Sequence, residues 1–517
     1  MQKMESLKTL RKQRELTQEE CARFLNMSRR AYQLLEAESG RQKSAKYQRC
    51  YNLLKDAEVV EQRKTLFKTH VFLGEDLFPL RDSVAELPKR HPFHDLHDFI
   101  EGQSTGKVCI LYGLRHSGKT TMLFQLLSEL DLEKSAYIQL NETFVMGDLI
   151  KDLNALKAKG VRYVLIDEIT LLPDFIPSCG VLSDIYAKLG MKIVLSGADS
   201  LGFALANMDA LYNRGVLIHA SHIPYGEYRE MSGEKGVDEY IQSPFNADDD
   251  QAKAAKRFID AAIITNIQRT LRNCHNLDRY PRLRALQEKN ALVTAIHGYL
   301  EELNHRFLLC IVEGKSEPSE LGLARTLSLQ EEEVKEIQEC LRALDVLSPT
   351  TTVYEDGSKK QRDVFLQPGL RFAITKGLVY DLLNDASFAS FTEKQKSAIG
   401  DNLIKQIKQR MLREVVLLET SMAQNEDKVF RYHFASGEEF DMLIAEKDDE
   451  FALFEIKRGK KAATNHLRDK PLLDAISSRF GECKSRTVLY RGENQKDDGI
   501  LYQNVEEYLS SLYQSKK

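Results

Sequence analysis

The chain changes along its length between helical periodicity and short runs of consecutive apolar residues. Residues 1–58 have the pattern of short helices joined by tight turns. Between residues 106 and 225, apolar runs alternate with amphipathic segments, which is typical of parallel strands buried on both faces and separated by helices. The strands predicted there are Val108–Tyr112, Ala136–Leu140, Tyr163–Ile166 and Lys192–Leu195.

The second half has two further patterns. Residues 226–385 are mostly of helical type, with a β-like stretch near Thr351–Leu366. Residues 395–517 begin with a long helix and then change to a hairpin with strands at Phe440–Ile444 and Phe451–Ile456. The pattern predicts a multidomain α/β chain.

The N-terminal segment contains two helix starts with capping residues. Thr17 followed by Glu20 is a capping box that opens a helix over Gln18–Leu25. Asn26 supplies a turn, and Ser28 is a suitable N-cap for a second helix over Arg29–Glu36. The apolar residues that fit a small core are Cys21, Phe24, Leu25, Met27, Tyr32 and Leu35.

This segment resembles the lambda-repressor/Cro-like helix-turn-helix family over about residues 4–55. The second helix begins after Ser28 and presents Arg29, Arg30 and Gln33, which we expect to reach base edges or phosphates in the major groove. The resemblance implies that Gln18 contacts a phosphate. Such domains read palindromes as dimers, so the chain is expected to self-associate. The alternative is a small helical bundle used for protein contacts.

Residues 113–120, Gly-Leu-Arg-His-Ser-Gly-Lys-Thr, fit the phosphate-loop pattern G-x-x-x-x-G-K-[ST] at every required position. The loop follows an apolar strand and precedes a helix. Gly113 and Gly118 allow the backbone to wrap around phosphate, and amide groups of the helix start, including that of Thr121, point inward. Lys119 is expected to contact the β- and γ-phosphates, and Thr120 to ligate Mg²⁺.

Two further strand ends carry polar side chains suited to this site. Asp167 and Glu168 follow a buried strand, where Asp167 is expected to hold Mg²⁺ and Glu168 to polarise the attacking water. A helix N-cap is the alternative role for this acidic pair. Ser196 ends the next strand and is a candidate sensor of the γ-phosphate. The sequence therefore predicts a site for ATP and Mg²⁺.

The whole module resembles bacterial and archaeal P-loop ATPases related to the AAA+ and STAND groups. The resemblance rests on residues 211–228, which are similar to that family's Gly-Arg … Pro-Leu-Ser-Phe-x-Glu-Phe segment with several changes. Arg214 is by this resemblance a candidate for neutralising transition-state charge, in the same chain or from a neighbouring subunit. A surface salt bridge is the alternative.

The C-terminal hairpin carries Asp441 on one strand and Glu455 with Lys457 on the other. Glu455 and Lys457 are two residues apart and share a face at about 6.6 Å. Two carboxylates and a lysine can hold a hard divalent cation and orient water for phosphodiester cleavage. This D…E-x-K pattern resembles PD-(D/E)XK nucleases, and Asp401 stands where the family has a glutamate as a further metal ligand. The alternative is a degenerate nuclease fold kept for binding or packing.

Composition and charge restrict the location and the partners expected for this chain. The chain has 517 residues, and residues 1–70 carry 16 Lys and Arg against 9 Asp and Glu, so nucleic-acid contact is expected to begin there. No apolar stretch approaches the roughly 18 residues of a membrane span. The start has no secretory signal pattern, and the eight cysteines are scattered singly. A cytoplasmic protein with free thiols is expected.

Together these patterns predict an ATP-binding and hydrolysing protein that binds double-stranded DNA, forms a homo-oligomer and carries a Mg²⁺-dependent nuclease domain. An ATP-responsive transcriptional regulator with an inactive nuclease-like domain is the alternative. The predicted organisation is a helix-turn-helix domain (1–60), a linker (61–92), a P-loop ATPase core (93–225), a helical lid (226–300), a winged-helix-like region (301–390) and a nuclease-like domain (391–517).

Overall fold

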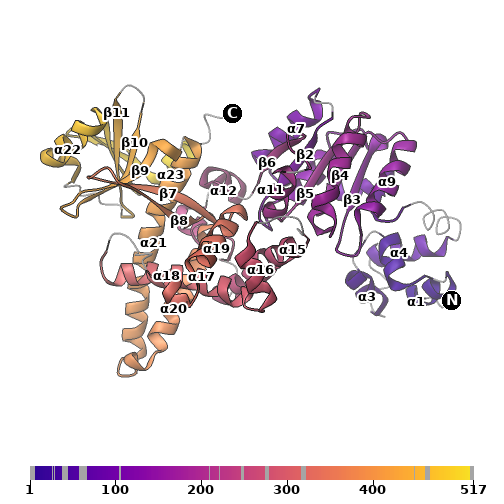
Figure 1. Cartoon of the computed structure of the whole chain (residues 1–517), viewed down its shortest axis with the longest axis horizontal. Coiled ribbons are helices and arrows are strands. Elements are labelled where there is room, and N and C mark those ends of the chain that lie inside the picture. The colour runs from indigo at the N-terminus through magenta and orange to yellow at the C-terminus, as the bar shows by residue number, and fades with distance from the viewer. Residues whose placement is uncertain are drawn as a thin grey trace. The chain divides into compact units, whose positions relative to one another are not determined.

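The computed structural model describes most of the chain, and its elements are labelled in Figure 1. The described residues are 6–14, 16–25, 27, 29–37, 45–56, 67–103, 106–208, 210–220, 222–233, 235–245, 250–273, 279–315, 322–424, 426–446, 449–459 and 466–512. The chain divides into two compact units. The first comprises Met1–Ser221 with Arg272–His275, and the second comprises His222–Leu271 with Asn276–Lys517.

The N-terminal segment is helical, and its predicted capping box is present. The elements are α1 (Leu7–Gln13), α2 (Gln18–Phe24), α3 (Arg29–Ala37) and α4 (Ala45–Lys55). The backbone N–H of Glu20 donates to Thr17 Oγ1 at 3.1 Å, and the N–H of Thr17 donates to the Glu20 carboxylate at 2.7 Å. Four helices pack around the small core that the sequence predicts, which includes Cys21, Leu25, Met27, Tyr32 and Leu35.

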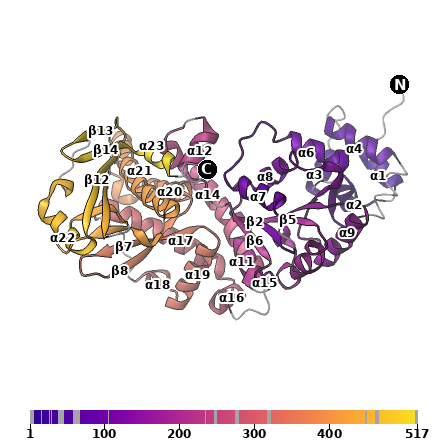
Figure 2. The ribbon, with the colours of Figure 1, turned by 90° about the horizontal axis from the view of Figure 1, so that it is seen from above.

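A six-stranded sheet forms the centre of the rest of the first unit (Figure 2). Its order is β1-β3-β4-β5-β2-β6, and all neighbours are parallel except the edge strand β1. The four predicted apolar runs form β2, β3, β4 and β5, because side chains on both faces of these strands are buried. The strands are β1 (His70–Leu73), β2 (Val108–Tyr112), β3 (Ser135–Gln139), β4 (Tyr163–Asp167), β5 (Lys192–Gly197) and β6 (Gly215–His219).

The structure departs from the predicted linker over residues 61–92. From residue 68 this segment belongs to the first sheet, where β1 pairs antiparallel with β3. Asp152, buried on α9 (Met146–Ala158), accepts hydrogen bonds from the backbone of Lys68 and Thr69 at 2.6 Å each. Two prolines of this segment stand at helix starts, Pro79 in α6 (Phe78–Asp82) and Pro92 in α7 (Pro92–Glu101).

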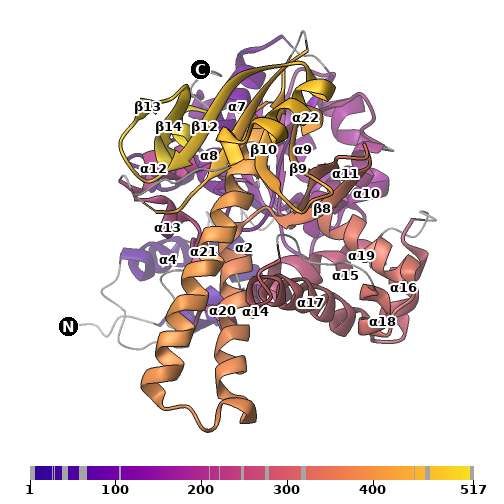
Figure 3. The same cartoon turned by 90° about the vertical axis from the view of Figure 1, so that its left-hand side faces the viewer.

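The second unit begins with helices. These are α12 (Tyr225–Ser232), α13 (Val237–Tyr240), α14 (Gln251–Phe258), α15 (Thr265–Asn273), α16 (Pro281–Glu288), α17 (Leu292–Val312), α18 (Leu323–Leu327), α19 (Glu331–Ala343), α20 (Pro368–Asn384) and α21 (Glu393–Ala423). The last two lie side by side in Figure 3. The described part of residues 292–365 contains three helices followed by a β-hairpin of Leu347–Tyr354 and Lys359–Phe365, and the winged-helix-like region stays a prediction.

An eight-stranded mixed sheet completes the second unit, in the order β13-β14-β12-β11-β10-β9-β7-β8. The predicted C-terminal hairpin is present as β10 and β11, with Leu443 opposite Leu453. The predicted boundary at residue 390 does not divide this sheet, because β7 pairs parallel with β9. The strands are β7 (Leu347–Tyr354), β8 (Lys359–Phe365), β9 (Val429–His433), β10 (Glu439–Ala445), β11 (Glu450–Ile456), β12 (Glu482–Tyr490), β13 (Gln495–Asp497) and β14 (Ile500–Asn504).

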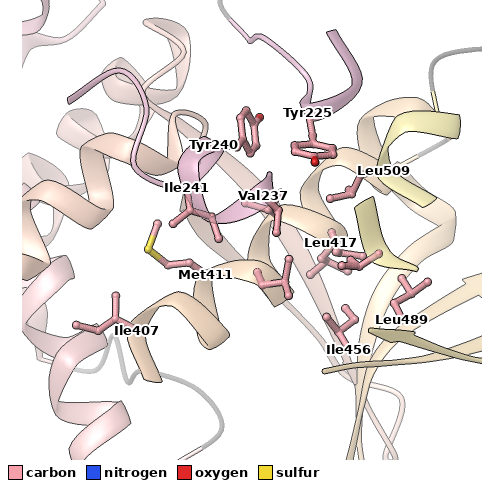
Figure 4. Packing of buried hydrophobic residues seen from close by; sticks show 14 of the residues in the cluster. Tyr225, Val237, Tyr240, Ile241, Ile407, Met411, Leu417, Ile456, Leu489 and Leu509 are labelled. Atoms are coloured by element: carbon pink, nitrogen blue, oxygen red, sulfur yellow. The ribbon is translucent and has the colours of Figure 1, made fainter. Parts of the chain in front are cut away.

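The segment around α12 and α13 is packed into the core of the second unit (Figure 4). Tyr225, Val237 and Ile241 are fully buried against α21 and α23 (Val505–Ser511). The buried carboxylate of Glu419 on α21 accepts hydrogen bonds from the N–H of Tyr225 and the hydroxyl of Tyr240, each at 2.8 Å. Residues 222–241 therefore belong to the C-terminal core by packing.

The described part of the chain contains no helix that is both long and apolar enough to cross a bilayer. Its seven described cysteines are free thiols.

Candidate nucleotide site and C-terminal carboxylates

The loop between β2 and α8 (Lys119–Leu126) has the backbone shape that its glycines predict. Gly113 has φ 147° and Gly118 has φ 80°, conformations that favour glycine. The Lys119 ammonium donates to the carbonyls of Gly113 and Leu114 at 2.8 Å each, and so holds the loop in a closed curve. The following amides, including that of Thr121, lie in the first turn of α8, where a helix provides no acceptor for them.

Arg90 supports this loop from the segment predicted as a linker. Its buried guanidinium donates to the carbonyl of Ser117 at 2.6 Å and to that of Ala220 at 2.8 Å. A Cβ added at Gly118 would lie 3.3 Å from Arg90 Cδ, in addition to the strain of its positive φ. Gly118 is therefore required both by the turn and by the packing of Arg90.

Asp167, at the end of β4, is the centre of a hydrogen-bond network of neutral donors. Its carboxylate accepts from Thr120 Oγ1 at 2.7 Å and from the Tyr137 hydroxyl at 2.9 Å. Ser196 Oγ, at the end of β5, also donates to it, and the backbone N–H of Glu168 donates at 3.1 Å. Parallel strands bring these residues together because their carboxyl ends meet at one edge of the sheet.

Glu168 is held in an unusual backbone conformation next to this network. Its φ is 58°, a left-handed value that is uncommon for a residue other than glycine. Burial raises the pKa of its carboxyl, the charge of Asp167 raises it further, and Lys119 acts in the opposite direction. A carboxyl with a raised pKa, close to the phosphate loop, suits the general base that the sequence predicts.

The donor set fits a magnesium nucleotide. A left-handed glycine loop, a buried lysine and a helix start suit phosphate oxygens. The Thr120 hydroxyl and Asp167 carboxylate, 2.7 Å apart, are oxygen ligands of the kind that Mg²⁺ takes. The residues that would hold the metal are therefore Thr120 and Asp167.

Arg214 does not reach this site within its own chain. It immediately precedes β6, and its carbonyl accepts from the N–H of Val108 at the start of β2. The phosphate loop follows the opposite end of β2, about 16 Å away for a strand of five residues. The guanidinium instead pairs with Asp184 at 2.7 Å. The predicted role of Arg214 in the same chain is wrong, and the salt-bridge alternative describes its environment.

Comparison with known proteins agrees with this geometry. Residues 105–229 match the family model of the AAA domain. This domain is a P-loop NTPase. It covers the loop, β4 with Asp167 and β5 with Ser196.

Two further comparisons concern the whole chain. No curated protein sequence matches the chain. A solved structure of the Saccharomyces cerevisiae Hsp104–ADP complex matches with 14% identity and a TM-score of 0.22. That alignment covers 67% of this chain and 49% of the Hsp104 chain, so it spans about half of Hsp104.

Some of the residues expected to contact DNA lie outside the part of the chain that the structure describes. Ser28 and the side chain of Arg29 lie there. Arg30 is exposed on α3. Gln33 Nε2 donates to Gln18 Oε1 at 3.1 Å, and Gln18 in turn donates to Glu36 at 2.5 Å. The two glutamines are thereby linked across α2 and α3, a pairing that the sequence analysis did not predict.

The C-terminal carboxylates lie on the paired strands β10 and β11. Lys457 Nζ is 3.1 Å from Glu455 Oε2, as their spacing of two residues predicts. Asp441 Oδ2 accepts from the N–H of Ile456 at 2.7 Å, which places it beside Glu455 across the hairpin. Asp441 and Glu455 are both buried.

Arg413 on α21, rather than Asp401, approaches this pair. Its Nε lies 3.2 Å from Asp441 Oδ1. Burial raises the pKa of Asp441, and the charge of Arg413 opposes that rise. Asp401 is exposed on the same helix, twelve residues before Arg413 or about 18 Å along the axis, so it is not a ligand beside Asp441.

Among the described residues no group of three or more His, Cys, Asp or Glu side chains gathers as a metal site would require. The structure brings Asp441, Glu455 and Lys457 together, but the guanidinium of Arg413 stands where a third carboxylate was expected.

Three residues of these sites could not be predicted from the sequence. Tyr137 gave no signal beyond its place in an apolar strand, because its hydroxyl meets Asp167 only when β3 pairs with β4. Arg90 lies in an irregular segment, and Arg413 is one of several cations on α21. Only strand pairing or helix packing selects them.

Proposed function

We propose that this protein is an ATP-hydrolysing DNA-binding protein in which the nucleotide state controls the action of the C-terminal unit. The observation that carries the proposal is the Asp167 network. It joins the phosphate loop through Thr120 to the end of β5 through Ser196. A change in metal or γ-phosphate at Thr120 would therefore alter the hydrogen bonds of a neighbouring strand.

Each residue of the ATPase domain has a separate role in this proposal. Lys119 neutralises the β- and γ-phosphates. Thr120 and Asp167 would hold Mg²⁺, which when bound would supply positive charge for the transferred phosphoryl group. Glu168 accepts a proton from the attacking water. DNA binding by α3 is supported by the capping box, the exposed Arg30 and the basic N-terminal segment.

The experiment is a titration of a labelled library of duplex DNA with the full chain, with and without ATP and Mg²⁺. Selective binding that changes with ATP supports the proposal. Triple replacement of Arg29, Arg30 and Gln33 by Ala should remove selectivity, at about 1–3 kcal/mol for each base that the variant no longer reads. Unchanged selectivity in the triple variant would transfer recognition to the winged-helix-like region.

Phosphodiester cleavage at the C-terminal carboxylates is the second candidate function. The observation in its favour is the buried Asp441–Glu455 arrangement with Lys457 at 3.1 Å. Incubation of plasmid with protein and Mg²⁺ or Mn²⁺ tests it, with Lys457→Ala as the control that should retain ATP hydrolysis. Intact plasmid under all conditions would favour a regulator with an inactive nuclease-like domain.

A further inference from the structure

A cleft of about 720 Å³ lies between α14 and α20 in the second unit. At its base the two helices approach closely, since a Cβ added at Gly377 would lie 2.9 Å from the Cβ of Ala252. The two helices are seen beside each other in Figure 3. The volume is that of a small-molecule site or of one or two nucleotide units. The lining residues are Asp250, Gln251, Ala252, Lys253, Lys256, Lys376, Gly377, Tyr380, Asp381 and Asn384.

The cleft is lined by three lysines and two aspartates, a formal net charge of +1. Lys253 and Lys256 are exposed on α14 and have no carboxylate partner within the described residues. Lys376 faces them from α20 and donates to Gln251 at 3.0 Å. Of the two acidic residues, Asp250 caps α14 by accepting from the N–H of Lys253 at 3.0 Å. Asp381 is exposed on α20, so the three lysines exceed the two aspartates by one charge.

An aromatic ring stands at the wall of this cleft. Tyr380 is 58% exposed, unusually open for so large a side chain, and the Lys376 ammonium lies 5.9 Å from its ring centre. Exposed rings beside cations are the elements that bind single-stranded nucleic acid, because a base stacks on the ring and phosphates meet the charges. A duplex offers no free base face to such a ring.

Two further cations of the second unit, Lys408 and Arg458, are already engaged within the chain. Lys408 on α21 is half-buried over the ring of Phe372, and burial lowers its pKa. The charges of Arg458 and Lys376 lower it further, while Asp238 and Glu239 act in the opposite direction. Arg458, the residue that follows Lys457, pairs with Asp238 at 2.8 Å.

We propose that the cleft between α14 and α20 binds single-stranded DNA, with a base stacked on Tyr380 and the adjoining phosphates held by its three lysines. This inference rests on the proposed function, since it supplies the substrate form on which the C-terminal unit acts.

The test is fluorescence anisotropy of a labelled single strand of about 12 nucleotides, a length comparable to known single-strand sites. The full chain carries Lys119→Ala in all samples, so that the phosphate loop does not compete. Tyr380→Ala should weaken binding about tenfold, and Tyr380→Phe should restore it. Lys253→Gln with Lys256→Gln should reduce the slope of log affinity against log salt by about 1.4, for two phosphates.

Matched controls use exposed residues elsewhere. Tyr212→Ala removes a ring that is 66% exposed, and Lys289→Gln with Lys359→Gln removes the same charge from the surface of the second unit. These variants should bind like the parent. Equal losses in the control and cleft variants, or no loss in either, would overturn the proposal.

Unlabelled competitors identify the ligand. A single strand should displace the probe, whereas a duplex or a mononucleotide at the same concentration should not. Displacement by the mononucleotide or the duplex in place of the strand would overturn the proposal. Binding of the strand without its cleavage in Mg²⁺ or Mn²⁺ would reject the nuclease function and leave the cleft assignment standing.

Discussion

Two buried aspartates, Asp167 at the end of β4 and Asp441 within β10, belong to the two units, and their partners differ in charge. Asp167 accepts hydrogen bonds from a threonine, a tyrosine, a serine and a backbone amide, all of them neutral. Asp441 accepts from one backbone amide and lies 3.2 Å from the guanidinium of Arg413. Neutral donors position a carboxylate without cancelling its charge, so Asp167 can still attract a cation.

The difference shows that a motif alone does not specify a metal site. Both aspartates stand in sequence patterns associated with Mg²⁺. A guanidinium beside Asp441 competes with a divalent cation for the same oxygen, because both need its negative charge. The ATPase domain is arranged for a metal, whereas the C-terminal pair must first displace Arg413.

The largest expected effect tests the ATPase side of this comparison. Glu168→Gln should bind ATP with Mg²⁺ and lower the hydrolysis rate about 100- to 10,000-fold, because it removes the general base. Lys119→Ala should lose nucleotide binding itself. Phosphate release and calorimetric ATP titration separate the two. Hydrolysis at the parent rate by Glu168→Gln would reject the assignment of the base.

The raised pKa of Glu168 gives a pH dependence with a defined sign. A base acts only when deprotonated, so kcat should fall as the pH decreases, beginning above the usual range for glutamate. Bound Mg²⁺ stabilises the charged carboxylate of Glu168, so the fall in kcat should begin at a lower pH when Mg²⁺ is saturating. Rate–pH profiles at limiting and saturating Mg²⁺ measure both. A profile that is flat down to the ordinary pKa of glutamate contradicts the prediction.

Glu419 extends the comparison to a buried carboxyl with neutral donors and no proposed metal. Burial raises its pKa to about 8, and His222 lies 3.7 Å away. Because the folded pKa exceeds the unfolded one, the contribution of Glu419 to stability should be fully present below about pH 4.5 and be lost as the pH rises towards 8, by about 1 kcal/mol per unit. Denaturant unfolding should show Glu419→Gln to be less dependent on pH. An equal decline in the variant would contradict this.

Arg413→Gln tests the comparison from the C-terminal side. Removing the guanidinium should raise the affinity of the domain for Mn²⁺ about tenfold, because Asp441 loses its competing charge. Calorimetry in the Lys119→Ala background measures this without the nucleotide site, and a further Asp441→Asn change should cancel the gain. If Arg413→Gln binds no metal, the domain is a scaffold.

The smallest expected effect is that of removing one neutral hydrogen-bond donor to Asp167, the hydroxyl of Tyr137. Tyr137→Phe leaves Asp167 with three of its hydrogen bonds and should cost about 1 kcal/mol of stability. ATP hydrolysis should decrease only a few-fold. Thermal unfolding and steady-state rates measure the two effects. A loss as large as that of Glu168→Gln would make Tyr137 a principal determinant of the site.

The phosphate loop could be predicted because its chemistry is contiguous. Gly113, Gly118, Lys119 and Thr120 lie within eight residues between a strand and a helix, and the local backbone suffices to bring them together. The capping box of Thr17 and Glu20 and the hairpin of β10 and β11 were predictable for the same reason, since each depends on near neighbours in sequence.

What the sequence determined by itself was therefore local: apolar strands, helix caps, the loop and the carboxylate pair. Only tertiary structure placed β1 in the first sheet, joined β7 to β9, and moved Arg214 to the edge opposite the phosphate loop. It also set Tyr137 against Asp167 and Arg413 against Asp441. The physical reason is that a side chain's partner across a sheet or helix face depends on register and packing, which local periodicity does not fix.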